Sequence, residues 1–282
     1  MSLCRIGNLE LGAGKPLAII GGPCVLESEA LGQQVGRVLR DACAAAGLQY
    51  IFKASFDKAN RSSINSPRGP GMERGLTWLA DLRRELAVPV TTDLHEPAQA
   101  EAVANHVDLL QIPAFLCRQT DLVLAVGQAA ARLDRAVNIK KGQFLSPGEM
   151  VGPVRKLTEV GCMNAMLTER GTFFGYGRLV NDFIGIVDMM HLSHKGRGPT
   201  PVCFDCTHST QLPGSGEQTG GRPDRAAHLA RAAVAAGVHC VFLECHPDPK
   251  SALSDGSTML RLEEVPALIK QLAAIRKATA SL

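Results

Sequence analysis

A cationic stretch at residues 53–63 holds the densest group of side chains that could bind an anion. It carries two lysines, one arginine, one asparagine and three serines within eleven residues. The apolar residues 48–52 before it predict a β-strand, so Lys53 would end this strand, while Lys58 and Arg61 follow on a loop. Lysine offers a point charge, arginine a planar fork, and serine and asparagine further hydrogen bonds. These residue types predict a phosphate site; the alternative is a solvated basic loop.

Four other side chains are of the types that bind divalent metal ions, namely Cys24, His208, Glu244 and Asp255. One thiolate, one imidazole and two carboxylates form a mixed ligand set that suits Zn, Fe, Mn or Co. Ligands this distant in sequence are a weaker signature than clustered zinc motifs. Three of them also have a structural alternative: Cys24 as a buried thiol, His208 as a hydrogen-bonded loop histidine and Asp255 as a turn former.

Eight short β-rich segments, each followed by a helical pattern, would position these groups. The expected strands cover residues 16–20, 48–52, 89–93, 107–112, 136–140, 164–168, 201–206 and 239–244. They contain few alternating polar positions, as is typical of parallel strands that are buried on both faces. We therefore expect a single α/β domain over residues 1–282, a (β/α)8 barrel with a short N-terminal hairpin. A doubly wound sheet is the alternative, because periodicity does not show closure.

The ends of the expected strands carry polar or reactive side chains. In chain order these are Cys24, Lys53, Asp93, Gln111, Lys140, Arg170, His208 and Glu244. They should meet, because barrel active sites form at the carboxyl ends of the strands. Together with Lys58 and Arg61, the cations among them imply more than one negative charge in the substrates. The pattern predicts an enzyme that acts on anionic small molecules.

Composition argues against several other classes of protein. The formal net charge is only +3 and aromatic residues make up 4% of the chain, so nothing indicates a nucleic-acid partner. No apolar run approaches the roughly 18 residues of a membrane span, and no signal-peptide core is seen, which predicts a cytoplasmic protein.

The nine cysteines are scattered and odd in number, which predicts reduced thiols. Cys203 and Cys206 form a C-x-x-C motif, but within one strand they would face opposite ways.

Eight sequence motifs together resemble one family of enzymes. They are GGPCVLES (21–28), FKASFDKANRSS (52–63), TDLHEP (92–97), QIPAFLCRQTDL (111–122), NIKKGQF (138–144), LTERG (167–171), FDCTHSTQLPG (204–214) and ECHPDP (244–249). These motifs resemble the 3-deoxy-D-manno-octulosonate 8-phosphate synthases, also named 2-dehydro-3-deoxyphosphooctonate aldolases. The resemblance runs from about residue 16 to the last expected strand. Residues 58–63 separate this family from the related 3-deoxy-heptulosonate phosphate synthases, whose equivalent loop is similar to Lys-Pro-Arg-Thr.

The resemblance implies an activity and a set of substrate contacts. The reaction would condense phosphoenolpyruvate with D-arabinose 5-phosphate and water, for the synthesis of a lipopolysaccharide sugar. Phosphoenolpyruvate would be bound by Lys53, Lys58, Lys140 and Arg170. Arabinose 5-phosphate would be bound by Asn60, Arg61 and Ser62, the last two reaching the neighbouring subunit of a homotetramer. The expected substrate-binding set is completed by Ser55, Asp93 and Gln111, and the expected catalytic set is Lys53, Lys140, His208, Cys24 and Asp255.

The resemblance also implies a divalent metal ion. Metal-independent members of the family tend to carry Met-Asn where this chain has Pro23 and Cys24, so we expect the metal-dependent branch. The ligands would be Cys24, His208, Glu244 and Asp255, and the ion would activate water or orient the aldose. The Gly-, Ser- and Pro-rich loops 209–223 and 246–257 are expected to act as lids, and Cys245 to face away from the barrel interior. The alternatives are a heptulosonate phosphate synthase and a non-catalytic barrel that binds a phosphorylated metabolite.

Overall fold

Eight parallel strands close into a barrel in the computed structural model, which describes residues 2–59, 66–194, 198–213 and 220–279. The barrel strands are β3 (Ala18–Gly22), β4 (Gln49–Lys53), β5 (Val90–Asp93), β6 (Leu109–Ile112), β7 (Ala136–Lys140), β8 (Ala165–Glu169), β9 (Val202–Asp205) and β12 (Cys240–His246). Each strand pairs in parallel with the next, and β12 pairs with both β9 and β3. This closure confirms the expected (β/α)8 barrel and excludes the doubly wound sheet.

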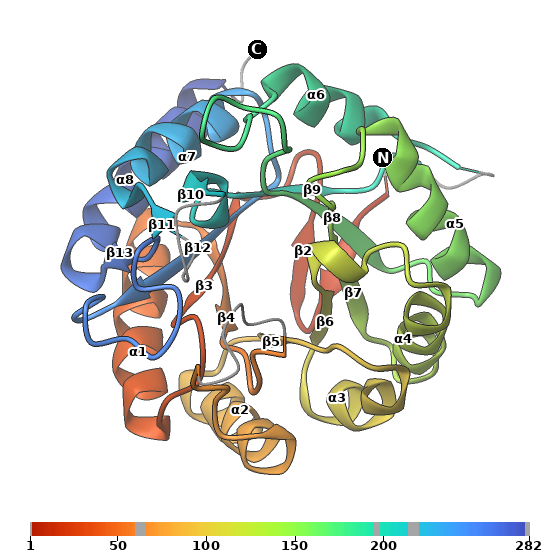
Figure 1. Ribbon diagram of the computed structural model, residues 1–282, viewed down its shortest axis with the longest axis horizontal. Helices are drawn as coiled ribbons and strands as arrows, with labels where there is room; N and C mark the ends of the chain where they lie inside the picture. Colours follow the sequence, from red (N-terminus) through yellow and green to blue (C-terminus); the bar gives the residue numbers. More distant parts are fainter. Residues whose placement is uncertain (1, 60–65, 195–197, 214–219, 280–282) are drawn as a thin grey trace.

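A ring of α-helices surrounds the barrel (Figure 1). Its members are α1 (Glu29–Ala46), α2 (Met72–Leu86), α3 (Ala100–His106), α4 (Thr120–Arg132), α5 (Val151–Glu159), α6 (Phe183–His191), α7 (Ala226–Ala235) and α8 (Val265–Thr279). Local chemistry sets the ends of α1: the Ser28 side chain accepts a hydrogen bond from the backbone of Leu31. Gly47 then ends the helix with φ 68°, a left-handed conformation that glycine adopts without steric cost.

Shorter elements lie in the connections. The single-turn 3-10 helices are η1 (Pro97–Gln99), η2 (Ala114–Leu116), η3 (Gly148–Met150), η4 (His208–Thr210), η5 (Pro223–Arg225) and η6 (Leu262–Glu264). Strand β13 (Leu260–Arg261) pairs with the end of β12, and β10 (Gln211–Leu212) pairs with β11 (Gly220–Gly221).

The expected N-terminal hairpin is present as β1 (Cys4–Ile6) and β2 (Leu9–Leu11). Its buried side chains join a cluster inside the barrel that includes Ile20, Ile51 and Phe242. Asn164, just before β8, exchanges hydrogen bonds with the backbone of Arg5 and so ties the hairpin to the amino-terminal ends of the strands. With one end of the barrel filled in this way, the other end is left for the active site.

A larger hydrophobic core lies between the barrel and the helices. Cys206 belongs to this outer core, while Cys203 belongs to the cluster inside the barrel, as the alternation along the strand predicted. Cys245 also lies in the outer core, which confirms that it faces away from the barrel interior. The expected boundaries match β7 and differ from the other observed strands by at most two residues at either end; β12, for example, continues to His246.

Candidate active site

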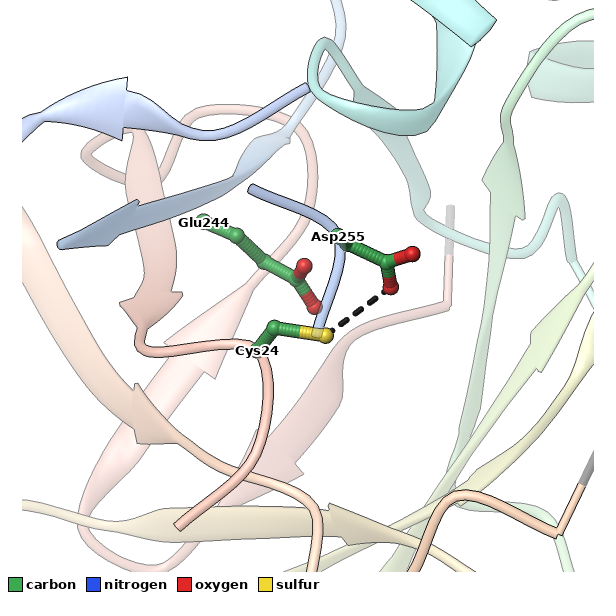
Figure 2. Close-up of side chains that lie close together, drawn as sticks. All are labelled: Cys24, Glu244 and Asp255. Carbon is green, nitrogen blue, oxygen red and sulfur yellow. Dashed lines mark hydrogen bonds between the residues drawn. The ribbon is translucent and has the colours of Figure 1, made fainter. Parts of the chain in front are cut away.

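The four candidate metal ligands lie together, although they come from four separate segments. The ligand atoms of Cys24, Glu244 and Asp255 all lie within 4.8 Å of one another (Figure 2). The Cys24 Sγ atom is 2.9 Å from Asp255 Oδ2. The His208 Nε2 atom is 3.5 Å from Glu244 Oε2 and 3.9 Å from Asp255 Oδ2. The thiol and the two carboxylates therefore face a common point, and the imidazole lies beside the two carboxylates.

The chemistry of these groups fits a cation at that point. Glu244 Oε2 is buried and has no hydrogen-bond partner within the described part of the chain. Burial, together with the carboxylates of Asp255 and Glu244, raises the pKa of the Cys24 thiol well above its usual value. A divalent ion would reverse this effect, since it stabilises a coordinating thiolate and occupies unpaired carboxylate oxygens. The metal site itself stays a prediction that this geometry supports.

Close backbone packing places Cys24 at the end of β3. A Cβ atom on Gly22 would lie 1.9 Å from the Lys53 carbonyl oxygen, so no other residue fits there without moving β4. The segments that follow β3 and β4 also pair through their backbones. The Ser55 amide donates to the Cys24 carbonyl, and the Leu26 amide donates to the Ser55 carbonyl. The tight approach of the two segments thus fixes where the thiol points.

Asp255 reaches the other ligands from the loop at 246–257, which the sequence predicted to be a lid. Its backbone has φ 51°, a left-handed conformation that aspartate tolerates better than most residues. Two further contacts attach the loop to the β3 exit: the Leu253 backbone donates to Glu27, and the Cys24 thiol contacts Ser254 at 3.2 Å. Movement of this loop, and of the loop at 209–223, which is only partly described, stays a prediction.

Cationic side chains line the same cavity, which has a volume of about 640 Å³. Lys58, Lys140 and Arg170 all contribute to its wall. The Arg170 guanidinium donates to Gln211 through Nη2, while its buried Nη1 has no partner within the described residues. These groups provide the positive potential that a phosphorylated carboxylic acid would need.

Lys53 lies below this cavity rather than in its wall. The side chain is almost fully buried, and its ammonium group donates to Glu244 Oε1 at 2.5 Å and to the Cys24 carbonyl at 2.8 Å. Burial alone would raise the pKa of Glu244, but Lys53 and His208 lower it below its usual value. The observed contacts of Lys53 are therefore with the metal-ligand group, and its role in binding substrate stays a prediction.

One buried network contains three members of the predicted substrate set, Ser55, Asp93 and Gln111. Asp93 accepts hydrogen bonds from Ser55 and from Gln111, both at 2.5 Å. The network continues through Asn138 to Thr168 across the barrel interior. Asp93 reaches the cavity wall, whereas Ser55 and Gln111 are fully buried and hold its carboxylate. The predicted residues Asn60, Arg61 and Ser62 lie outside the described residues.

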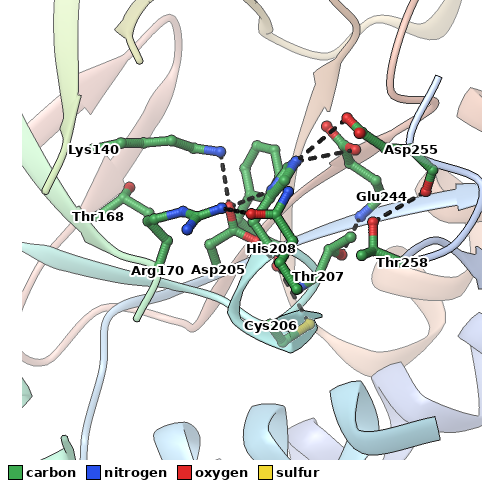
Figure 3. Close-up of polar contacts among 12 residues, drawn as sticks. Lys140, Thr168, Arg170, Asp205, Cys206, Thr207, His208, Glu244, Asp255 and Thr258 are labelled. Atoms are coloured by element: carbon green, nitrogen blue, oxygen red, sulfur yellow. Dashed lines mark hydrogen bonds and ion pairs between the residues drawn. The ribbon is translucent and has the colours of Figure 1, made fainter. Parts of the chain in front are cut away.

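Sequence reasoning missed Asp205, the last residue of β9. Its carboxylate lies 2.8 Å from Lys140 Nζ and 2.6 Å from His208 Nδ1 (Figure 3). Burial opposes ionisation, yet His208 and Lys140 hold the pKa of Asp205 far below its usual value. An acid within the motif FDCTHS is the available signal, but the sequence pattern assigns the reactive group at the end of that strand to His208. His95, Gln143 and Gln211 also line the cavity and were not predicted.

Comparison with known proteins agrees with the resemblance carried by the motifs. The family model described as the DAHP synthetase I family matches residues 5–280. A protein of Cyanothece sp. named 2-dehydro-3-deoxyphosphooctonate aldolase is 49% identical over 274 residues, which cover 97% of each chain. Proteins of the same name from Nitratidesulfovibrio vulgaris and Geobacter sp. are 52% and 46% identical and cover 91% and 96% of each chain.

The chemistry at the strand ends and the extent of these matches lead to the same assignment. In the described part of the chain, none of the helices combines the length and the apolar character needed to cross a lipid bilayer. The chain belongs to the 2-dehydro-3-deoxyphosphooctonate aldolase family, within the DAHP synthetase I family.

Proposed function

We propose that this protein is a divalent-metal-dependent synthase that condenses phosphoenolpyruvate with D-arabinose 5-phosphate and water. The products are 3-deoxy-D-manno-octulosonate 8-phosphate and inorganic phosphate, and the reaction would serve the cytoplasmic synthesis of a lipopolysaccharide sugar. The observation that carries the proposal is one cavity lined both by cationic side chains, Lys58, Lys140 and Arg170, and by three candidate metal ligands, His208, Glu244 and Asp255, with Cys24 in contact with Asp255.

The reaction joins two anions, so charge must be neutralised before the carbon atoms can approach. Lys58, Lys140 and Arg170 supply three positive charges around the cavity. Phosphoenolpyruvate carries a phosphate and a carboxylate, and these cations would bind both groups and hold the enol face toward the aldehyde. Binding both reactants in one orientation lowers the activation barrier, because the two anions no longer have to meet in the right geometry by diffusion in solution.

The bond changes are those of an aldol-type condensation with loss of phosphate. Carbon C3 of phosphoenolpyruvate attacks the aldehyde carbon of the open-chain pentose, while a water oxygen adds to C2. The aldehyde oxygen takes up a proton, and the water loses one. The resulting tetrahedral hemiketal phosphate then breaks its C2–O bond to phosphate, and the C2 hydroxyl gives its proton to the departing phosphate, which leaves the 2-keto acid. The loop 246–257, which lies over the ligand group, would limit the entry of further water.

Cys24, His208, Glu244 and Asp255 would hold the ion, as Zn, Fe, Mn or Co, which would supply a Lewis-acidic centre beside the substrates. Support for the metal-dependent branch comes from the thiol of Cys24 and from Glu244 Oε2, which is buried and accepts no hydrogen bond from the described residues. Lys53 pairs with the other oxygen of Glu244 and keeps it from turning away.

The test measures the loss of phosphoenolpyruvate absorbance on adding arabinose 5-phosphate, before and after dialysis against a chelator. We expect turnover that disappears on chelation, returns with added divalent metal, and leaves the circular dichroism spectrum unchanged throughout. Turnover that survives thorough metal removal would contradict the metal-dependent branch. Erythrose 4-phosphate as the preferred aldose would indicate a heptulosonate phosphate synthase, and binding without any turnover would indicate a metabolite-binding barrel.

A homotetramer with a shared active site is also part of the proposal. Its support is a set of exposed, largely apolar side chains: Phe174 and Tyr176, in the loop between β8 and α6, are 98% and 96% exposed, and Ile184, on α6, is 76% exposed. Exposed apolar groups of this size commonly mark contact surfaces between chains. Light scattering of the purified protein should give a mass near four chains, and Tyr176→Glu should lower it. A monomeric wild-type protein with full activity would contradict this part.

A further inference from the structure

Asp205 is fully buried and contacts one residue from each functional group of the cavity. These are Lys140, from the cationic side chains, and His208, from the candidate metal ligands. Its Oδ1 atom accepts hydrogen bonds from the backbone of Thr207 at 3.1 Å and of His208 at 2.9 Å. Its Oδ2 atom contacts His208 Nδ1 at 2.6 Å and Lys140 Nζ at 2.8 Å (Figure 3). All four contacts come from donors, so the carboxylate is held on every side and has no other conformation available.

The contact with His208 decides which ring nitrogen is available. An ionised carboxylate can only accept, so His208 Nδ1 must carry the proton that it donates to Asp205. The other nitrogen, Nε2, is the atom that faces Glu244 and Asp255. In metal sites, a hydrogen bond from the ring nitrogen that does not bind the metal orients the histidine and fixes its tautomer. Asp205 thus keeps Nε2 of His208 unprotonated and oriented toward the other candidate ligands, so that its lone pair can bind a metal ion.

The contact with Lys140 places an ammonium group at the cavity wall. Asp205 holds this group from below, and the Phe242 ring, 3.8 Å from Nζ to its centroid, packs against it. Two contacts restrict the long side chain to one position and leave it to meet an anion from the cavity side. A single oxygen atom, Asp205 Oδ2, therefore orients a residue of each predicted group.

We propose that Asp205 is a positioning residue that couples the two halves of the site, so that its loss weakens binding of the metal and of phosphoenolpyruvate together. This proposal rests on the proposed function, because it assigns Asp205 a role in that same site. Asp205 touches neither substrate nor metal in the proposal; it acts through His208 and Lys140.

The experiment compares Asp205→Asn with Asp108→Asn. Asp108 is a matched control, because it is also buried, accepts a backbone hydrogen bond from Val90 and pairs with Arg83 and Arg135. It precedes β6 and so lies at the opposite end of the barrel. Zinc affinity is measured by competition with a chromogenic chelator, phosphoenolpyruvate binding by calorimetry, and unfolding by denaturant for both variants.

For Asp205→Asn we expect zinc affinity to fall roughly 10- to 100-fold, which is the range for removal of a residue that hydrogen-bonds to a metal ligand. Phosphoenolpyruvate affinity should fall several-fold in the same variant. Asp108→Asn should lower stability but leave both affinities within about twofold of the wild type, as expected for distant independent sites. Loss of stability alone in Asp205→Asn, with both affinities unchanged, would overturn the proposal.

A measurement on the wild-type protein covers the case in which Asp205→Asn does not fold. In the zinc-loaded protein with ¹⁵N-labelled histidine, the His208 signals, assigned with His208→Gln, should show a proton on Nδ1. A proton on Nε2 would overturn the proposal. A wild-type protein that binds both zinc and phosphoenolpyruvate keeps the proposed function in place whatever Asp205 does, whereas binding of neither overturns both.

Discussion

Lys53 and Glu244 form an ion pair that is closed off from solvent at the centre of the site. The Lys53 Nζ atom lies 2.5 Å from Glu244 Oε1, and the two side chains are 1% and 0% exposed. The ammonium group also donates to the carbonyl of Cys24, so it contacts two segments that carry candidate ligands. A positive charge thus compensates the ligand group from within the protein, which lets the site fold before a metal ion arrives.

Lys53→Met should therefore destabilise the metal-free protein strongly, because Glu244 would be left as a buried charge with less compensation. Breaking a buried pair from one side costs about 3–5 kcal/mol. Denaturant unfolding of the metal-free protein measures the loss. The double variant Lys53→Met/Glu244→Leu should recover a large part of it, since neither charge then remains. Losses that simply add in the double variant would show that the two side chains are not coupled.

Much of the site could be anticipated from where apolar segments end. Lys140 and Arg170 follow runs that are β-rich and apolar, and a parallel barrel brings all such ends together. How deep each side chain lies below the cavity could not be anticipated in this way. Strand alternation places Lys53 on the same face as Ile51, but it does not show whether the ammonium group reaches the cavity or pairs with Glu244 beneath it. That distinction depends on neighbouring strands.

Asp205 shows a second limit of the sequence. It stands inside the run that predicts β9, where a buried acid is unfavourable unless donors surround it. Those donors are Lys140, from another strand, together with the ring of His208 and the backbone at the start of η4. Asp255 was predicted as a ligand from its residue type and from the resemblance, because its loop has no periodic pattern that would place it. What the sequence lacked for Asp205 was tertiary information about its donors.

Gly22→Ala should disrupt the site, whereas Gly21→Ala provides a matched neighbour. A Cβ atom at Gly22 would meet the Lys53 carbonyl oxygen at 1.9 Å, and backbone cannot move aside as a side chain can. At Gly21 the nearest atoms are the side-chain ends of Leu39 and Leu243, at 3.1 and 3.3 Å. We expect the Gly22 variant to lose several times more unfolding free energy than the Gly21 variant. Equal losses would show that β3 and β4 can separate freely.

Arg170→Lys should weaken phosphoenolpyruvate binding without affecting the metal. Lysine cannot reproduce the planar fork that lets one nitrogen contact Gln211 while Nη1 remains available for an anion. The Michaelis constant for phosphoenolpyruvate should rise about tenfold, in line with the loss of one charge-assisted hydrogen bond. Steady-state kinetics measure this change, and Arg132→Lys, at an exposed position, is the control. A parallel loss of zinc affinity would mean that Arg170 also supports the ligand group.

His239 should make the protein less stable in mild acid by a route that is remote from the active site. It precedes β12, and its Nδ1 accepts a hydrogen bond from the Val202 backbone at 3.0 Å. Burial, with a smaller effect of Arg276, lowers the pKa of His239 from 6.5 to about 4. Between these values the unfolded chain binds a proton that the folded protein does not bind. Stability from the neutral imidazole is therefore complete above the unfolded pKa and declines as the pH falls toward the folded pKa.

His239→Asn tests this, because its side-chain oxygen can replace Nδ1 as the acceptor while the titrating group is removed. Denaturant unfolding of the wild type and the variant is compared at about pH 7.5 and about pH 5. The linkage relation gives a loss of about 2 kcal/mol from His239 at the lower pH, which the variant should not suffer. The stability difference between the two proteins should therefore shift in favour of the variant on acidification. A difference that stays constant with pH would show that His239 already titrates normally in the folded protein.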